Sequence, residues 1–186
     1  MSPKIKISKE DIINAALGIV QERGTQAINA RALAAVLKCS TQPIFSNFAT
    51  MEELRLAVTE KADALCRAYI QREVESGNFP VYKASGMAYI RFAKEEKELF
   101  KLLYMRDRSG ESIPESTELG DKMEEIVHDN TGLNVEEAKL FHLEMWAYVH
   151  GIAAMFATGF LDLEWELVSK MLTDSYQGLR KQYGME

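Results

Sequence analysis

The sequence predicts an all-α protein of about nine helices, with a small three-helix head followed by a larger helical body. Apolar residues recur at every third or fourth position along most of the chain, whereas strand-like alternation is scarce. The 186 residues include only four prolines, which leaves room for long helices. Helix-start signals, in which a short polar side chain precedes an acid by three positions, occur at Ser8, Thr50 and Asn134.

The head is predicted to contain three helices. The first begins at Ser8 and ends before Gly24, a residue typical of the position after a helix. Its expected buried stripe consists of Ile13, Ala16, Leu17 and Val20. The second and third helices lie within residues 29–48, where Asn29 and Ser40 are placed as their N-terminal caps.

The third of these helices has the character of a DNA-reading helix. Pro43 falls in its first turn, where a missing N–H costs little, and Ile44 and Phe48 point inward from positions four apart. Its remaining side chains are small and polar and carry no net charge. Because an exposed helix of this kind suits insertion into the major groove, residues 29–48 predict a helix-turn-helix.

Candidate DNA contacts lie in and around the two short helices. They are Asn29, Arg31, Thr41, Gln42, Pro43, Phe45, Ser46, Asn47 and Thr50. Arg31 either contacts DNA or is a surface arginine. The first-turn residues of the reading helix either contact bases or simply suit a first turn, and Gln42 is the best candidate for a bidentate pair with adenine. Phe45 and Phe48 could both close the core instead, which is the preferred interpretation for Phe48.

Charge is distributed unevenly along the chain. Residues 1–50 carry six basic and three acidic side chains, whereas the rest carries 16 basic and 25 acidic ones. A basic head on an acidic body is expected when only the head faces phosphates. Lys4, Lys6 and Lys9 would add backbone contacts.

The body is predicted to begin with a long fourth helix from Thr50 to near Gly77. Its apolar side is expected to consist of Leu54, Val58, Ala62, Leu65 and Tyr69. At roughly 25 residues this helix is long for a globular protein and suits a connector. Further helices are expected at 81–96, 97–105, 116–130, 134–158 and 162–183, with a surface loop at 106–116.

Aromatic side chains and methionines concentrate in the body. Those considered for a ligand pocket, together with one histidine, are Met87, Phe92, Phe100, Tyr104, Met105, Met123, Trp146 and His150. For each residue taken singly, a place in the ordinary core is the preferred interpretation. Together they favour a pocket, because methionine adapts to irregular shapes and ligands lie between the helices of bundles.

The last two predicted helices suggest a homodimer. Residues 138–157 are apolar on two faces, and the final helix adds Leu167 and Met171 at helical spacing. A helix with two apolar faces needs two neighbours, and Gly151 and Ala154 permit a close crossing. Burial within one subunit is the alternative, and a four-helix interface between two chains is the preferred interpretation.

No pattern predicts a metal site, a cofactor or catalysis. His142 and His150 lie about two turns apart without a cysteine or carboxylate cluster beside them. Phosphate-binding glycine loops and nucleophile motifs are missing from the sequence. Cys39 and Cys66 are expected to be reduced thiols, and no apolar run approaches membrane-spanning length, so a cytoplasmic protein with no membrane association is expected.

The chain resembles the TetR family of one-component repressors over residues 8–58. The matching residues are Ile13, Ala16, Gly24, Arg31, Leu33, Ala34, Leu37, Ser40, Ile44, Phe45, Phe48, Glu53 and Leu54. The segment Trp146 to Met155, with His150 followed by Gly151, also resembles the Trp…His-Gly signature of one C-terminal ligand-domain class in this family. Two positions depart from the family pattern: Phe45 stands where a tyrosine is usual, and Met51 where a lysine is common.

The resemblance implies a DNA-binding domain at 1–50 and an effector-binding, dimerising domain at 51–186. The expected function is that of a repressor that binds a pseudo-palindromic operator as a homodimer. A small, largely apolar effector would release it by tilting the fourth helix. The alternatives are a small-molecule-binding helical protein with a vestigial head, and an activator or constitutive binder without an effector.

Overall fold

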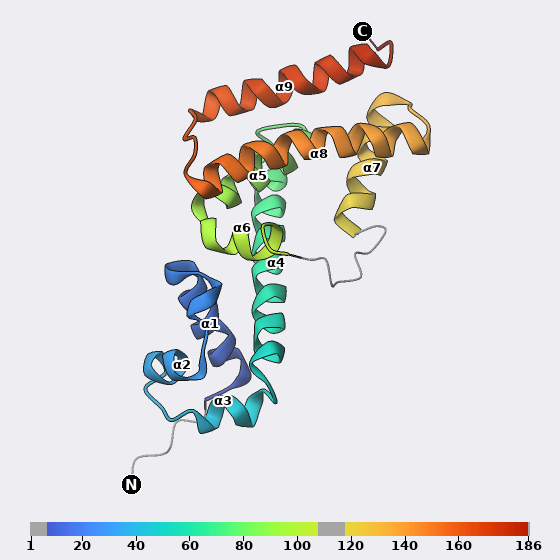
Figure 1. Cartoon of the computed structure of the whole chain (residues 1–186). Coiled ribbons are helices and arrows are strands. Elements are labelled where there is room, and N and C mark those ends of the chain that lie inside the picture. The colour runs from blue at the N-terminus through green and yellow to red at the C-terminus, as the bar shows by residue number, and fades with distance from the viewer. Residues whose placement is uncertain (1–6, 108–117, 186) are drawn as a thin grey trace. The chain divides into compact units, whose positions relative to one another are not determined.

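The computed structural model describes residues 7–107 and 118–185, and within them the protein is entirely helical (Figure 1). The described residues form nine α-helices and one short 3₁₀ turn, η1 (Thr25–Ala27), without a strand. The α-helices are α1 (Lys9–Arg23), α2 (Ala30–Val36), α3 (Gln42–Asn47), α4 (Met51–Ser76), α5 (Val81–Glu95), α6 (Lys97–Tyr104), α7 (Glu118–Thr131), α8 (Val135–Thr158) and α9 (Trp165–Gln182). The expected loop at 106–116 falls mostly outside the described residues. None of the helices described here is long and apolar enough to cross a membrane.

The described helices divide into two contact units. The head unit contains α1, α2, α3, the part of α4 up to Arg67, and α6. The body unit contains α4 from Ala68 onward together with α5, α7, α8 and α9. Helix α4 is therefore one continuous helix that contributes to both units.

Helix α1 begins and ends as its sequence predicts, but it buries a different face. Ser8 and Asp11 form a reciprocal capping box, and Gly24 follows the helix with φ = 77°. The residues of α1 buried in the head are Ile12, Ala16, Ile19 and Val20. Ile13 and Leu17, which were expected to be buried, are only half-buried. Adjacent faces of this helix are both apolar, so contacts with the other helices decide which face is buried.

The start of α3 also differs from the expectation. Ser40 does not cap the helix; Thr41 occupies the cap position and makes no capping bond with its side chain. Pro43 still lies in the first turn. A proline there already removes one of the N–H groups that a cap would satisfy, so the helix begins without this bond.

Helix α4 follows a side-chain cap, in which Thr50 Oγ1 accepts a hydrogen bond from the Glu53 N–H at 3.1 Å. Leu54, Val58 and Ala62 are fully buried, as expected. Beyond them the buried side consists of Cys66 and Ile70 rather than Leu65 and Tyr69. The straight i, i+4 series continues, and the aromatic ring of Tyr69 lies at its margin, edge-on to Phe92.

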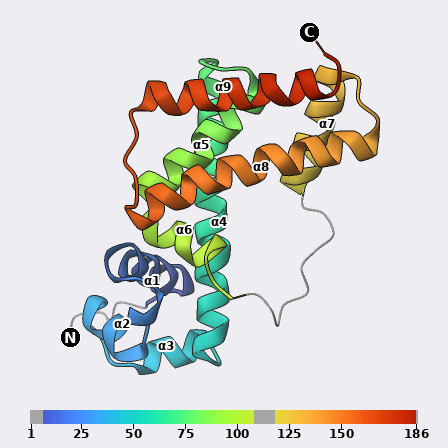
Figure 2. The same cartoon turned by 45° about the horizontal axis from the view of Figure 1, so that its top comes forward.

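In the body unit α8 packs along α5 and contacts α7 and α9 (Figure 2). Asn134 and Glu137 form the predicted capping box, and Gly159 ends α8 in the left-handed conformation with φ = 70°. Gly86 on α5 allows a close approach, since a Cβ there would lie 3.1 Å from Leu172 Cδ2 of α9. Helix α9 begins at Trp165, three residues later than the predicted start at Asp162.

Candidate nucleic-acid interface

Helix α3 presents one buried and one exposed side. Ile44 and Phe48 are 0% and 1% exposed and anchor the helix in the head core, where α1 packs against both α2 and α3. Gln42, Phe45 and Ser46 are exposed on the other side. The buried Phe48 agrees with the preferred interpretation, whereas Phe45 is 53% exposed and does not close the core.

Hydrogen bonds within the motif limit what its polar side chains can offer a partner. Ser46 Oγ donates to the Gln42 carbonyl at 2.9 Å, and Asn47 Nδ2 donates to the Pro43 carbonyl at 2.8 Å. Thr50 Oγ1 accepts from the backbone and keeps its own O–H proton available. The Gln42 amide makes no hydrogen bond to the described residues, so both its donor and its acceptor are available to a base edge.

The N-terminal cap of α2 is also committed internally. Asn29 Oδ1 accepts from the Ala32 N–H at 2.9 Å, and its Nδ2 donates to the Ala27 carbonyl at 3.2 Å. Arg31 is exposed in the first turn of the helix. Of these two candidates, Arg31 is the freer to approach a phosphate, while Asn29 holds the helix end in place.

The negative charges of the acidic residues closest to α3 in sequence are paired with neighbouring basic groups. Glu53 accepts hydrogen bonds from the Ala49 N–H at 2.8 Å and from Lys9 Nζ at 3.1 Å, and these bonds lower its carboxyl pKa. Glu52 pairs with Arg55. Lys9, one of the expected backbone donors, is thereby engaged within the head, and Lys4 and Lys6 lie outside the described residues.

The turn between α2 and α3 contains a feature that periodicity did not reveal. Lys38 has φ = 51°, and no other non-glycine residue in the described segments has a positive φ. Its N–H donates to the Ala35 carbonyl at 3.3 Å, and the Cys39 N–H donates to the Ala34 carbonyl at 2.9 Å. This pair of bonds is a Schellman motif, in which glycine is usual at the position of Lys38. For a residue with a Cβ this conformation costs roughly 1 kcal/mol of folding free energy.

The structure divides the ligand-pocket candidates between the two units. Phe100, Tyr104 and Met105 belong to the head unit, where the Tyr104 hydroxyl lies 3.6 Å from the buried Cys66 Sγ. The other five belong to the body unit: Met87, Phe92, Met123, Trp146 and His150. Met87, Phe92 and Phe100 are fully buried, whereas Met105 and Trp146 are 44% and 42% exposed.

Two tyrosine–histidine pairs join α5 to α8, and the sequence pattern predicted neither pair. Tyr82 Oη lies 3.0 Å from His142 Nδ1, and Tyr89 Oη lies 2.9 Å from His150 Nδ1. Burial lowers the pKa of both imidazoles. Trp146 stacks on His150 with ring centroids 5.0 Å apart, so the Trp…His-Gly segment forms a stacked pair on α8. Only the register between α5 and α8 reveals the tyrosine partners.

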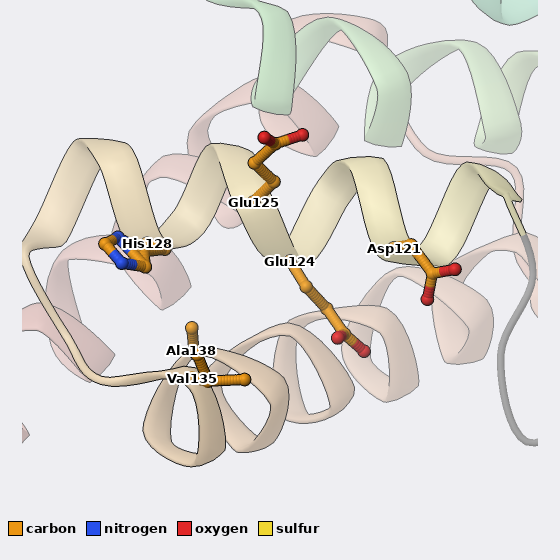
Figure 3. A pocket seen from close by; sticks show the side chains of 6 residues that line it. All are labelled: Asp121, Glu124, Glu125, His128, Val135 and Ala138. Carbon is orange, nitrogen blue, oxygen red and sulfur yellow. The ribbon is translucent and has the colours of Figure 1, made fainter.

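A shallow pocket of about 230 Å³ lies between α7 and α8 (Figure 3). It is lined by Asp121, Glu124, Glu125, His128, Val135 and Ala138. None of the predicted pocket residues lines it. In the described segments no group of three or more His, Cys, Asp or Glu side chains is arranged to hold a metal ion.

Comparison with known proteins bears on the second half of the chain. The family model "Tetracyclin repressor-like, C-terminal domain" matches residues 82–174, half of the chain. No curated protein matches the sequence. The match covers α5 to α8 and part of α9, so the role of the head rests on its own geometry.

Proposed function

Because the chain belongs to the tetracycline repressor-like (TetR) family of transcriptional regulators, we propose that it is a ligand-responsive repressor. It binds a pseudo-palindromic operator as a homodimer in the cytoplasm, and a small, largely apolar effector releases it. The proposal requires no metal, cofactor or catalytic activity.

The exposed side of α3 carries the DNA-binding part of this proposal. Gln42 offers an uncommitted amide at the start of a helix without acidic residues, and the helix is anchored by Ile44 and Phe48. Glutamine hydrogen-bonds adenine bidentately in the major groove. Arg31 on α2 and the Thr50 hydroxyl at the start of α4 supply phosphate contacts that fix the register of the helix.

The homodimer is supported by an uncovered apolar face in the body unit. Leu140, Leu143 and Trp146 on α8 are 50%, 57% and 42% exposed, and Leu167 on α9 is 46% exposed. A Cβ built at Gly151 on α8 or at Gly178 on α9 would meet no atom within 4 Å. Two helices with small residues and apolar side chains on one face suit a C₂ four-helix interface.

A two-fold dimer supplies the second reading helix that a pseudo-palindrome requires. The two heads would occupy half-sites about one helical turn, ~34 Å, or a multiple apart. Helix α4 contributes to both contact units, so an effector that favours one α4 orientation would change the spacing of the heads. The coupling is then the difference in effector affinity between the two states.

The proposal is tested by titrating a labelled random-sequence DNA duplex with the purified protein at about 50 and 200 mM salt. We expect the logarithm of the binding constant to fall linearly with the logarithm of the salt concentration. Selection from a random pool of duplexes should then enrich a pseudo-palindrome. If the protein binds no duplex at the lower salt, the repressor function is contradicted. The second candidate, a small-molecule-binding protein with a vestigial head, would then be favoured by Phe45 and Met51, which replace two usual phosphate-binding residues.

A further inference from the structure

The turn that leads into α3 holds a lysine where the backbone favours glycine. Lys38 occupies the left-handed position of the Schellman motif that ends α2, and φ there is 51°. The two hydrogen bonds of the motif need only backbone groups, so the lysine side chain contributes nothing to the turn itself. A side chain kept at a strained backbone position is a reason to look for a function of that side chain.

Among the described basic groups of the head, the Lys38 ammonium differs from most in having no acidic partner. Lys9 pairs with Glu53, Lys61 with Glu10, and Lys101 with Glu98. Within the described part of the chain no carboxylate lies within ion-pair distance of Lys38, and its side chain is exposed. An exposed, unpaired ammonium keeps its full attraction for an anion.

The position of Lys38 in the chain places this charge beside the reading helix. Lys38 lies three residues before Thr41, the cap residue of α3, and four before Gln42. When a reading helix enters the major groove, the segments that flank it face the phosphates on either side. A flexible lysine suits a phosphate partner, because its ammonium binds as a point charge without strict geometry.

We propose that Lys38 is a phosphate-contacting residue of the DNA interface, held at the strained turn so that its ammonium reaches the DNA backbone next to α3. The inference rests on the proposed DNA-binding function. Because α3 lacks the usual tyrosine hydroxyl at Phe45 and α4 the usual lysine at Met51, this contact supplies part of the electrostatic attraction that the head would otherwise lack.

Three substitutions at one position separate charge from backbone strain. Lys38→Gly removes the charge and relieves the strain, Lys38→Ala removes the charge and keeps the strain, and Lys38→Arg keeps both. Lys122→Ala on α7 is the matched control, since it removes an exposed positive charge in the body unit. The probe is the random-sequence duplex, titrated over a range of salt concentrations.

We expect Lys38→Gly and Lys38→Ala to bind the duplex about 3- to 10-fold more weakly and to flatten the salt slope by about 0.9. The loss should be the same on an enriched operator, because a phosphate contact carries no sequence information. Lys38→Arg and Lys122→Ala should bind as the wild type does. Lys38→Gly should unfold in urea no earlier than the wild type, which excludes misfolding as the cause of its weaker binding.

Wild-type affinity and salt slope in Lys38→Gly would overturn the inference while leaving the DNA-binding function intact. An equal loss in Lys122→Ala would also overturn it, because the effect would then reflect net charge alone. If the wild-type protein binds no duplex at all, the proposed function and this inference both fall.

Discussion

Tyr82 on α5 and His142 on α8 are joined by a hydrogen bond of 3.0 Å between the phenol oxygen and Nδ1. Their rings meet edge-on with centroids 5.9 Å apart, next to the aromatic ring of Tyr176 from α9. Burial lowers the pKa of His142 and raises that of Tyr82, so both groups are neutral at physiological pH. The bond therefore joins a neutral phenol to a neutral imidazole, and it connects two helices of the body unit.

The lowered pKa of His142 predicts that acid destabilises the protein. In the unfolded chain a histidine binds a proton below a pH of about 6.5, whereas His142 in the folded protein does so only at lower pH. The unfolded state therefore gains stability first as the pH falls, and the free energy of unfolding decreases between about pH 7.5 and 5.5. Urea unfolding at the two pH values measures the decrease.

His142→Gln should reduce this pH dependence, because the variant has no proton to bind at that position. The comparison variant is His128→Gln, which changes an exposed histidine on α7. His150, whose pKa is also lowered by burial, leaves part of the effect in the variant. A His142→Gln protein with the full wild-type pH dependence would show that His142 is not responsible.

Gln42→Ala is expected to weaken binding to the enriched operator by about 1–3 kcal/mol. The expected effect on a random duplex is small, because the proposed partner of the glutamine amide is a base rather than a phosphate. Anisotropy titrations of both duplexes at one salt concentration measure the two losses. Equal losses on the two duplexes would assign Gln42 to the DNA backbone or to the fold.

Phe45→Tyr is expected to strengthen DNA binding by about 1 kcal/mol, through a hydroxyl that donates to a phosphate. The ring of Phe45 is 53% exposed, so the added hydroxyl meets water and causes no strain in the head. Phe48→Tyr is the informative contrast, because that ring is buried and a hydroxyl there should destabilise the fold. Unchanged or weaker DNA binding by Phe45→Tyr would place Phe45 away from the backbone.

Ala154→Arg is expected to break the proposed dimer. Ala154 lies on α8 one turn beyond Gly151, and an arginine there would bring an unpaired charge into a closely packed interface. Light scattering should give twice the chain mass of 21.0 kDa for the wild type and a single chain mass for the variant. The same substitution at Ala64, which is exposed on α4, should leave the dimer intact. A wild-type mass of one chain at micromolar concentration would contradict the dimer and the two-groove mechanism.

Helix positions followed from the sequence wherever local signals were strong. Capping residues at Ser8, Thr50 and Asn134, and the glycine at position 159, fixed the ends of α1, α4 and α8 to within a residue or two. Helix α9 lacked such a signal, since Glu164 makes no capping bond, and its start was placed too early. Local chemistry therefore predicts an end only where a capping side chain or a glycine marks it.

Which face of a helix becomes buried depends on partners that one helix does not specify. In α1, Ile12 and Ile19 are buried although Ile13 and Leu17 are equally apolar. The body presents the same difficulty, because Tyr82 meets His142 only through the register of α5 against α8. The left-handed turn at Lys38 carried no sequence signal, because a helix that ends in this conformation usually has a glycine there.

The buried thiol of Cys66 can report the transient opening of the head core around it. Burial raises its pKa to about 11, against a smaller opposing effect of the Tyr104 hydroxyl. Only the thiolate attacks an alkylating reagent, so a folded head at neutral pH presents almost no reactive sulfur at this position. The rate at which a maleimide labels Cys66 should therefore follow the transient exposure of the core around α4. The half-exposed Cys39 should react faster and provides an internal reference. DNA or an effector that stiffens the head would be detected as a slower reaction at Cys66, without any label attached beforehand.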